Sequence, residues 1–108
     1  MYDRLQAGCG ARLYLVTSRS GRSSWDHYAR DLGINLIRAR QAKGMSQERV
    51  AHSAGISTYT YQKYEKGESR PGTPANPRLV TLLALCQVLD VEIERLLPPD
   101  PPDVTGGR

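Results

Sequence analysis

The sequence predicts an all-α protein of five short helices. Apolar side chains recur every three or four residues between residues 26 and 97, which is the period of an amphipathic helix. Glycines and prolines interrupt the pattern at intervals of about one helix length. A chain of 108 residues has room for one such domain and its tails. We therefore divide it into a flexible basic arm over residues 1–25, a helical domain over residues 26–97 and a Pro-rich disordered tail over residues 98–108.

The first helix is expected to begin at Asp26. Its recurring positions follow one another at steps of three or four residues, so they share one face. They are Tyr28, Leu32, Leu36, Ala39 and Lys43. Gly44 then ends the helix, because a residue without a Cβ atom adopts the left-handed backbone of a helix terminus at no steric penalty.

The second and third helices are short and closely spaced. Ser46 and Ser57 are N-caps, since a serine hydroxyl accepts a hydrogen bond from an unpaired N–H of the first turn. The second helix covers residues 47–53, with Val50 and Ala51 facing inward. The third helix with its cap covers residues 57–66. The closing glycines are Gly55 and Gly67.

The region after the third helix is interpreted as a loop, because residues 68–77 hold three of the seven prolines. Asn76 and Pro77 then have the character of an N-cap and first-turn residue of a fourth helix. We expect its inward face to consist of Leu79, Leu82, Leu83, Cys86 and Leu89. Asp90 is expected to cap a fifth helix, which contributes Val91, Ile93, Leu96 and Leu97 to the core. Pro98 and Pro99 stop that helix.

Composition narrows the class of function. The 15 basic and 11 acidic residues give a net charge of +4, which permits a polyanionic partner. Cys9 and Cys86 do not have a metal-binding spacing, and His27 and His52 are far apart in the sequence. We expect no enzymatic activity, catalytic residue, cofactor or metal site. There is no apolar run long enough to span a membrane and no secretory signal, so we expect a cytoplasmic protein.

The third helix has two faces of different chemistry. Hydroxyl, amide and ammonium groups fall in one sector, where they can contact base edges and phosphates. These are Thr58, Tyr59, Gln62, Lys63 and Lys66. Thr60, Tyr61 and Tyr64 occupy the opposite side, where we expect the two rings to pack with their hydroxyl groups at the surface. Two capped helices joined by a tight turn can place such a face in a DNA major groove.

Residues 31–97 resemble the Cro/C1-type (Xre-like) repressor family. The matching features are Leu36 and Arg40 in the first helix, KGMSQE at residues 43–48, AGIS at residues 54–57 and YEKG at residues 64–67. The Leu-rich fourth and fifth helices also match. The resemblance implies a five-helix, lambda-repressor-like DNA-binding domain. This sequence differs from the family pattern at two places, which are the longer loop after Gly67 and the bulky Tyr59.

The resemblance also implies roles for individual residues. Thr58, Tyr59 and Lys63 would read base edges, with Gln62 as a fourth reader. Gln47 would hydrogen-bond a phosphate and brace the third helix. Ser57, Lys66 and Arg70 would contact phosphates, which fix register without reading sequence. Arg40 and Glu65 would form an ion pair that joins the first helix to the end of the third.

These implications lead to one hypothesis and one alternative. The hypothesis is a sequence-specific transcriptional regulator, a repressor that controls its own promoter, which binds a near-palindromic double-stranded DNA operator as a homodimer. Apolar residues off the main stripe of the fourth helix, including Val80, Leu85 and Val88, would either pack on neighbouring helices or form the subunit interface with Ile93 and Leu97. The alternative is an adaptor or antitoxin that uses the same fold mainly to bind a partner protein.

Overall fold

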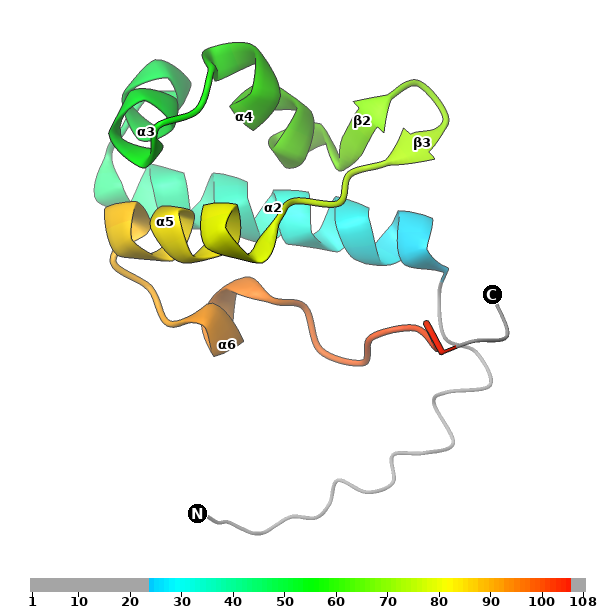
Figure 1. The fold of residues 1–108 in the computed structure, drawn as a ribbon. Coiled ribbons are helices and arrows are strands. Elements are labelled where there is room, and N and C mark those ends of the chain that lie inside the picture. The colour runs from blue at the N-terminus through cyan, green and yellow to red at the C-terminus, as the bar shows by residue number, and fades with distance from the viewer. Residues whose placement is uncertain (1–23, 106–108) are drawn as a thin grey trace, which may run out of the picture.

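The computed structural model describes residues 24–105. This range contains five helices and a small two-stranded antiparallel sheet (Figure 1). The elements in chain order are α2 (Trp25–Lys43), α3 (Gln47–Ala54), α4 (Thr58–Lys66), β2 (Glu68–Arg70), β3 (Thr73–Pro74), α5 (Leu79–Leu89) and α6 (Ile93–Leu96). The predicted helical fold is therefore confirmed, with one hairpin added to it.

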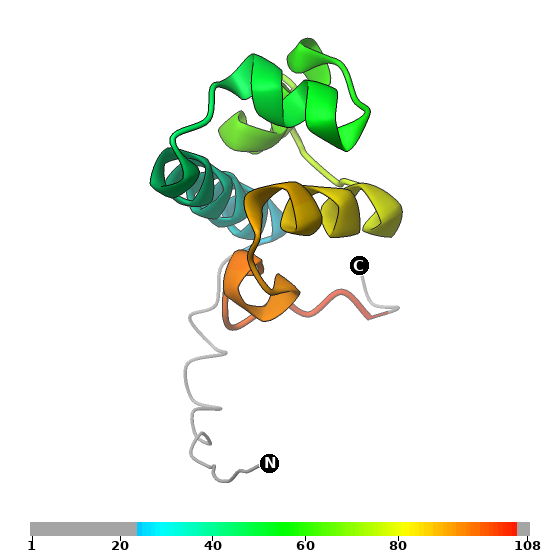
Figure 2. The ribbon, with the colours of Figure 1, turned by 90° about the vertical axis from the view of Figure 1, so that its left-hand side faces the viewer.

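The core lies among all five helices. Figures 1 and 2 show α3 and α4 on one side of the layer formed by α2 and α5, and α6 on the other side. The largest fully buried side chains are Tyr61, Leu36, Leu85, Leu89, Leu96 and Val50. Asn35 of α2 donates a hydrogen bond from Nδ2 to the carbonyl of Leu96 at 2.8 Å, which fixes α6 beneath α2. Within residues 24–105, no helix is long and apolar enough to cross a membrane.

The helix α2 begins slightly earlier than predicted. The hydroxyl of Ser24 accepts a hydrogen bond from the backbone N–H of His27 at 3.3 Å, which makes Ser24 the N-cap and Trp25 the first helical residue. The last two residues of the predicted basic arm therefore belong to the helical body. Residues 1–23, which carry the rest of that arm, lie outside the described part of the chain.

The start of α2 is joined to the segment after α6. The rings of Trp25 and Tyr28 stack with their centroids 5.5 Å apart, and the hydroxyl of Tyr28 donates to the carbonyl of Pro98 at 2.9 Å. Pro98 is buried. The packed body therefore continues one residue into the segment that we assigned to the tail.

The predicted loop after α4 contains a hairpin. Strands β2 and β3 pair antiparallel, with Glu68 opposite Pro74, and the connecting turn places Gly72 at a φ of 80°. The N–H of the buried Ala75 then donates to the carbonyl of Gly67 at 2.9 Å. This bond holds the chain against the end of α4 through residue 75.

Two predicted helix caps are wrong. Because Ala75 is still bound to Gly67, the chain reaches helical geometry only after Arg78, which is the N-cap of α5 in place of Asn76. Asp90 does not begin the last helix; it ends α5 with a left-handed backbone at a φ of 60°. Aspartate tolerates this conformation better than most residues. Glu92 is the N-cap of α6.

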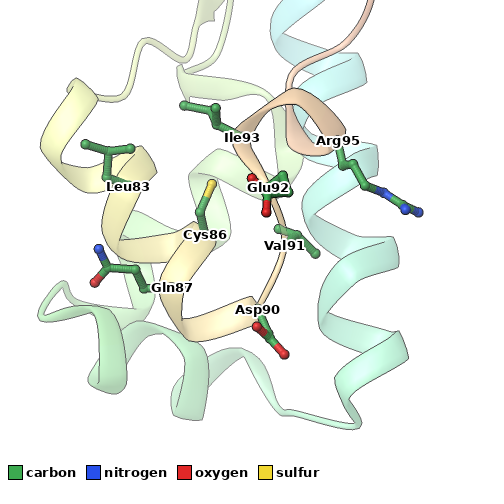
Figure 3. A pocket seen from close by; sticks show the side chains of 8 residues that line it. All are labelled: Leu83, Cys86, Gln87, Asp90, Val91, Glu92, Ile93 and Arg95. Carbon is green, nitrogen blue, oxygen red and sulfur yellow. The ribbon is translucent and has the colours of Figure 1, made fainter. Parts of the chain in front are cut away.

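The buried face of α5 also differs from the prediction. Leu79 and Leu83 were expected in the core but are 65% and 43% exposed, whereas Leu85 is fully buried. The inward stripe starts at Leu82 and continues through Leu85, Cys86 and Leu89 with helical spacing. Leu83 lies at the edge of a hollow of about 720 Å³ between α5 and α6 (Figure 3).

Candidate nucleic-acid interface

The helices α3 and α4 form a tightly capped pair. The hydroxyl of Ser46 accepts from the N–H of Arg49 at 3.1 Å, and the hydroxyl of Ser57 accepts from the N–H of Thr60 at 3.0 Å. Gly55 closes α3 with a φ of 78°. Ser57 also donates to the hydroxyl of Thr60 at 2.9 Å, so a phosphate contact by its hydroxyl would replace this bond.

One face of α4 is buried against the body and the opposite face is exposed or half-buried. Tyr61 and Glu65 are buried against the body, whereas Tyr59 is 70% exposed. Lys66 is exposed, and Thr58, Gln62 and Lys63 are half-buried. The prediction that the Tyr61 hydroxyl reaches the surface is wrong. That oxygen is enclosed within the body, and burial raises the pKa of Tyr61 well above its ordinary value.

On α4 the ammonium group of Lys63 lies over the ring of Tyr59, one turn before it. The Lys63 ammonium lies 4.5 Å from the centroid of the Tyr59 ring. Residues four apart share one helix face, and a cation is attracted to the negative face of an aromatic ring. The bulky Tyr59 therefore positions Lys63 on the outward surface of α4.

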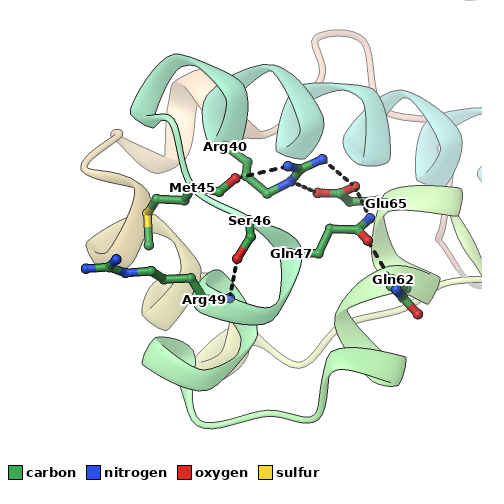
Figure 4. A network of polar contacts seen from close by, with 7 residues as sticks. All are labelled: Arg40, Met45, Ser46, Gln47, Arg49, Gln62 and Glu65. Carbon is green, nitrogen blue, oxygen red and sulfur yellow. Dashed lines mark hydrogen bonds and ion pairs between the residues drawn. The ribbon is translucent and has the colours of Figure 1, made fainter.

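A polar network connects α2, α3 and α4 (Figure 4). Arg40 of α2 donates from Nε to Glu65 Oε2 at 2.7 Å and from Nη2 to Glu65 Oε1 at 3.3 Å. A third bond runs from Arg40 Nη1 to the carbonyl of Met45 at 3.0 Å. Gln47 at the start of α3 donates from Nε2 to Glu65 Oε1 at 2.8 Å. Gln62 donates from Nε2 to Gln47 Oε1 at 3.1 Å, so the network reaches the outward face of α4.

The carboxylate of Glu65 is ionised in this network. Burial by itself raises the pKa of Glu65, but the hydrogen bonds from Arg40 and Gln47 outweigh it and hold the pKa below its ordinary value. The Glu65 side chain is only 5% exposed. Its negative charge therefore depends on Arg40.

This pKa shift predicts that Glu65 adds to stability above its ordinary pKa of 4.5. A carboxyl group whose folded-state pKa is depressed stabilises the fold above the unfolded-state pKa, and the gain is lost as the pH falls through the folded-state pKa. We expect urea unfolding to show a steeper loss of stability below about pH 4.5 than in an Arg40→Met/Glu65→Leu double variant. Parallel pH profiles for the two proteins would contradict this assignment.

Most of the predicted contact residues surround one hollow. It has a volume of about 440 Å³ and lies beside α4, where residues of α2 and α3 complete its lining. Its lining is Ile37, Gln47, Tyr59, Gln62, Lys63, Glu65 and Lys66. Arg70 stands apart from this group, because it is exposed on β2 beyond the end of α4. Among the described residues, no cluster of three or more metal-binding side chains occurs.

The arrangement of two capped helices on a three-helix support has known relatives. The model of the helix-turn-helix family matches residues 36–96, which is more than half of the chain. The chain belongs to the Cro/C1-type helix-turn-helix family of DNA-binding transcriptional regulators. The family resemblance drawn from the sequence is thereby confirmed.

Individual relatives agree with this assignment. The regulator is 40% identical over 65 residues to the SPbeta prophage-derived HTH-type transcriptional regulator YonR of Bacillus subtilis, covering 60% of this chain and 55% of YonR. It is 32% identical over 77 residues to the HTH-type transcriptional regulator y4dJ of Sinorhizobium fredii, covering 71% of this chain and 92% of y4dJ. The match therefore spans only about half the length of YonR.

A solved structure matches the regulator as well. The restriction-modification controller protein C.AhdI of Aeromonas hydrophila superposes with a TM-score of 0.56 at 32% identity. The superposition covers 64% of this chain and 96% of C.AhdI. Nearly all of C.AhdI thus corresponds to the helical body described above.

One residue of this helix-turn-helix regulator was missed from the sequence. Gly33 of α2 is buried where α4 crosses it, and a Cβ atom built there would lie 2.3 Å from the carbonyl oxygen of Glu65. The absence of a side chain lets the backbones of α2 and α4 approach closely. Gly33 occupies a helix interior, where glycine is unfavourable, and that is the signal that could have identified it.

Proposed function

We propose that the regulator binds DNA sequence-specifically by inserting α4 into the major groove. The observation that carries this proposal is the outward face of α4, where hydroxyl, amide and ammonium groups surround one hollow. The base readers in this proposal are Thr58, Tyr59, Gln62 and Lys63, which can donate to or accept from base edges. The phosphate contacts are Gln47, Ser57, Lys66 and Arg70.

The rigid attachment of α4 to the body supports groove insertion, in addition to the polar groups on its outward face. The α4 helix is capped at its start by Ser57 and held at its end through Glu65 to Arg40 of α2. A reader helix that is fixed to the body loses little conformational entropy when it binds. The adaptor alternative is not favoured, because the named relatives are transcriptional regulators.

Selection from random duplexes tests the DNA contacts. Lys63→Ala is expected to weaken binding to the selected site by about 5- to 150-fold, which corresponds to about 1–3 kcal/mol for a lost base contact. Lys66→Ala is the matched control on the same helix. It should weaken binding to all duplexes alike and lower the salt slope by about one. A lack of salt-dependent binding by the unaltered protein would reject the proposal.

We also propose that the DNA-binding form is a homodimer. Leu79, Val80 and Leu83 leave an exposed apolar strip on α5, and the strip continues into the hollow of Figure 3. The same hollow carries acidic Asp90 and Glu92 beside basic Arg95. A surface with both charges can pair with its own copy across a two-fold axis. Two α4 helices about 34 Å apart would then read a near-palindromic operator.

Sedimentation equilibrium tests the dimer. Leu83→Asp is expected to shift the protein from dimer to monomer and to reduce binding to a palindromic duplex, because the charge would be buried at the interface without a partner. Ile34→Asp is a close control, since Ile34 on α2 is 44% exposed and Leu83 is 43% exposed. A dimer that survives Leu83→Asp would exclude this surface.

Repression, including repression of its own gene, is the regulatory mode we propose. A bound dimer covers at least one turn of promoter DNA and can exclude the polymerase by occupying that site. A reporter fused to the region upstream of the coding gene should lose expression when the protein is supplied and keep it with Lys63→Ala. Increased expression would instead identify an activator.

A further inference from the structure

The series of hydrogen bonds that runs from Arg40 through Glu65 and Gln47 to Gln62 has a fixed donor-to-acceptor direction. Arginine has only donors, and the ionised carboxylate of Glu65 has only acceptors. The Gln47 atom that lies 2.8 Å from Glu65 Oε1 must therefore be its NH₂ group. Chemistry thus determines the orientation of the Gln47 amide, because the reverse orientation would place two oxygens together.

The orientation of the Gln47 amide in turn determines the orientation of the Gln62 amide. With its NH₂ group turned to Glu65, Gln47 offers only Oε1 to its other neighbour, and that atom needs a donor. Gln62 supplies it from Nε2 at 3.1 Å. Figure 4 shows the Gln62 oxygen at the opposite end of its amide, pointing away from Gln47 and the network. The groups that remain free on Gln62 are Oε1 and the second hydrogen of Nε2.

An acceptor beside a donor matches one base edge in the major groove. Adenine presents the N6 amino group beside the N7 acceptor. Guanine presents two acceptors, thymine presents an acceptor beside a methyl group, and cytosine presents an amino donor with no acceptor beside it on its own edge. A free oxygen at this position would face an acceptor on guanine or thymine. Only one hydrogen of Gln47 Nε2 is used by Glu65, so the phosphate contact proposed for Gln47 is compatible with this arrangement.

We propose that the Arg40–Glu65 ion pair orients the amide of Gln62 through Gln47, so that Gln62 selects adenine in the operator. The proposal rests on the proposed insertion of α4 into the major groove and adds the base that one reader recognises. Gln47, Glu65 and Arg40 act as positioning residues. The ion pair between α2 and α4 thus contributes to sequence preference as well as to stability.

The test measures base preference at one position of the selected site. That position is the base pair at which Gln62→Met loses discrimination, since methionine keeps the length of the side chain without its hydrogen-bonding groups. The unaltered protein should prefer adenine there by about 5- to 150-fold over the other bases. Replacing the adenine by purine, which lacks only the 6-amino group, should weaken binding as much as Gln62→Met does.

The role of Gln47 is tested by Gln47→Met. This variant frees the Gln62 amide to turn, so the adenine preference should fall to within about threefold while preferences at the other base pairs persist. Gln47 is half-buried at the start of α3, and the variant leaves the Arg40–Glu65 pair in place. Unfolding in urea would verify that it is folded.

Three results would overturn the inference. They are a preference for guanine, cytosine or thymine at the Gln62 position, an unchanged affinity for purine, and an unchanged adenine preference in Gln47→Met. Failure of the proposed function is a different result, because the unaltered protein would then select no sequence at all. The two failures are therefore separated by the first selection experiment.

Discussion

Replacement of Gly33 by alanine is expected to destabilise the protein by about 1–3 kcal/mol. Helix propensity alone predicts the opposite, since alanine in a helix interior is favoured over glycine by about 1 kcal/mol. The added methyl group would meet the carbonyl oxygens of Glu65 and Tyr64 at 2.3 Å and 2.8 Å. Both atoms belong to backbone, so α2 and α4 would have to move apart.

Thermal and urea unfolding measure this effect. Gln41→Ala is a control in the same helix, because Gln41 is exposed and its replacement should change stability by less than about 0.5 kcal/mol. A higher melting temperature in Gly33→Ala would show that the two helices can separate freely. The same variant should also reduce DNA affinity, because α4 carries the proposed readers.

Arg40→Met is expected to have the larger effect, a loss of about 3–5 kcal/mol. The variant leaves the carboxylate of Glu65, which is only 5% exposed, without its charged partner. Removing one member of a buried ion pair is more harmful than replacing both members by apolar side chains. The Arg40→Met/Glu65→Leu double variant should therefore recover most of the lost stability.

The double variant separates two explanations. If Arg40→Met and the double variant unfold at the same denaturant concentration, the loss comes from missing packing rather than from an unpaired charge. An unchanged melting temperature in Arg40→Met would mean that water replaces the guanidinium. Circular dichroism during urea titration distinguishes these cases.

Local signals in the sequence were sufficient for the helix-turn-helix itself. Ser46 and Ser57 cap the helices that were predicted from them, and Gly55 ends α3 as expected. Each of these features depends on a hydrogen bond or a backbone angle within a few residues. Such interactions can be inferred from neighbouring residues without knowledge of the rest of the fold.

Features that depend on distant contacts were not predictable in this way. Asn76 has the composition of a helix cap, but the bond from Ala75 to Gly67 holds the chain in the hairpin at that point. Leu79 and Leu83 have the same hydrophobicity as Leu85, and only the packing of α5 decides which of them is buried. Periodicity identifies a helix with an apolar stripe but does not show which of several apolar stripes faces inward.

The sequence predicted which residues share one face of α4, but it did not predict how their side chains are oriented. The spacing of α4 placed Tyr59, Gln62 and Lys63 on one face, as the structure does. The sequence contains no information on the direction of a hydrogen bond between side chains, so the orientation of Gln62 emerged only from its contacts. Tyr61 was assigned to the inner face, but the depth of its hydroxyl depends on Glu65 and the surrounding helices.

The bond between Tyr28 and Pro98 affects how the protein can be handled. It brings the first turn of α2 together with the residues that follow α6, on the side of the body away from α3 and α4. A fluorophore or affinity handle attached beside Ser24 or Pro99 would therefore leave the helix-turn-helix free. Immobilisation through either point should preserve binding to a duplex in solution, whereas attachment through the exposed Lys66 on α4 would place the protein with its reading face toward the support.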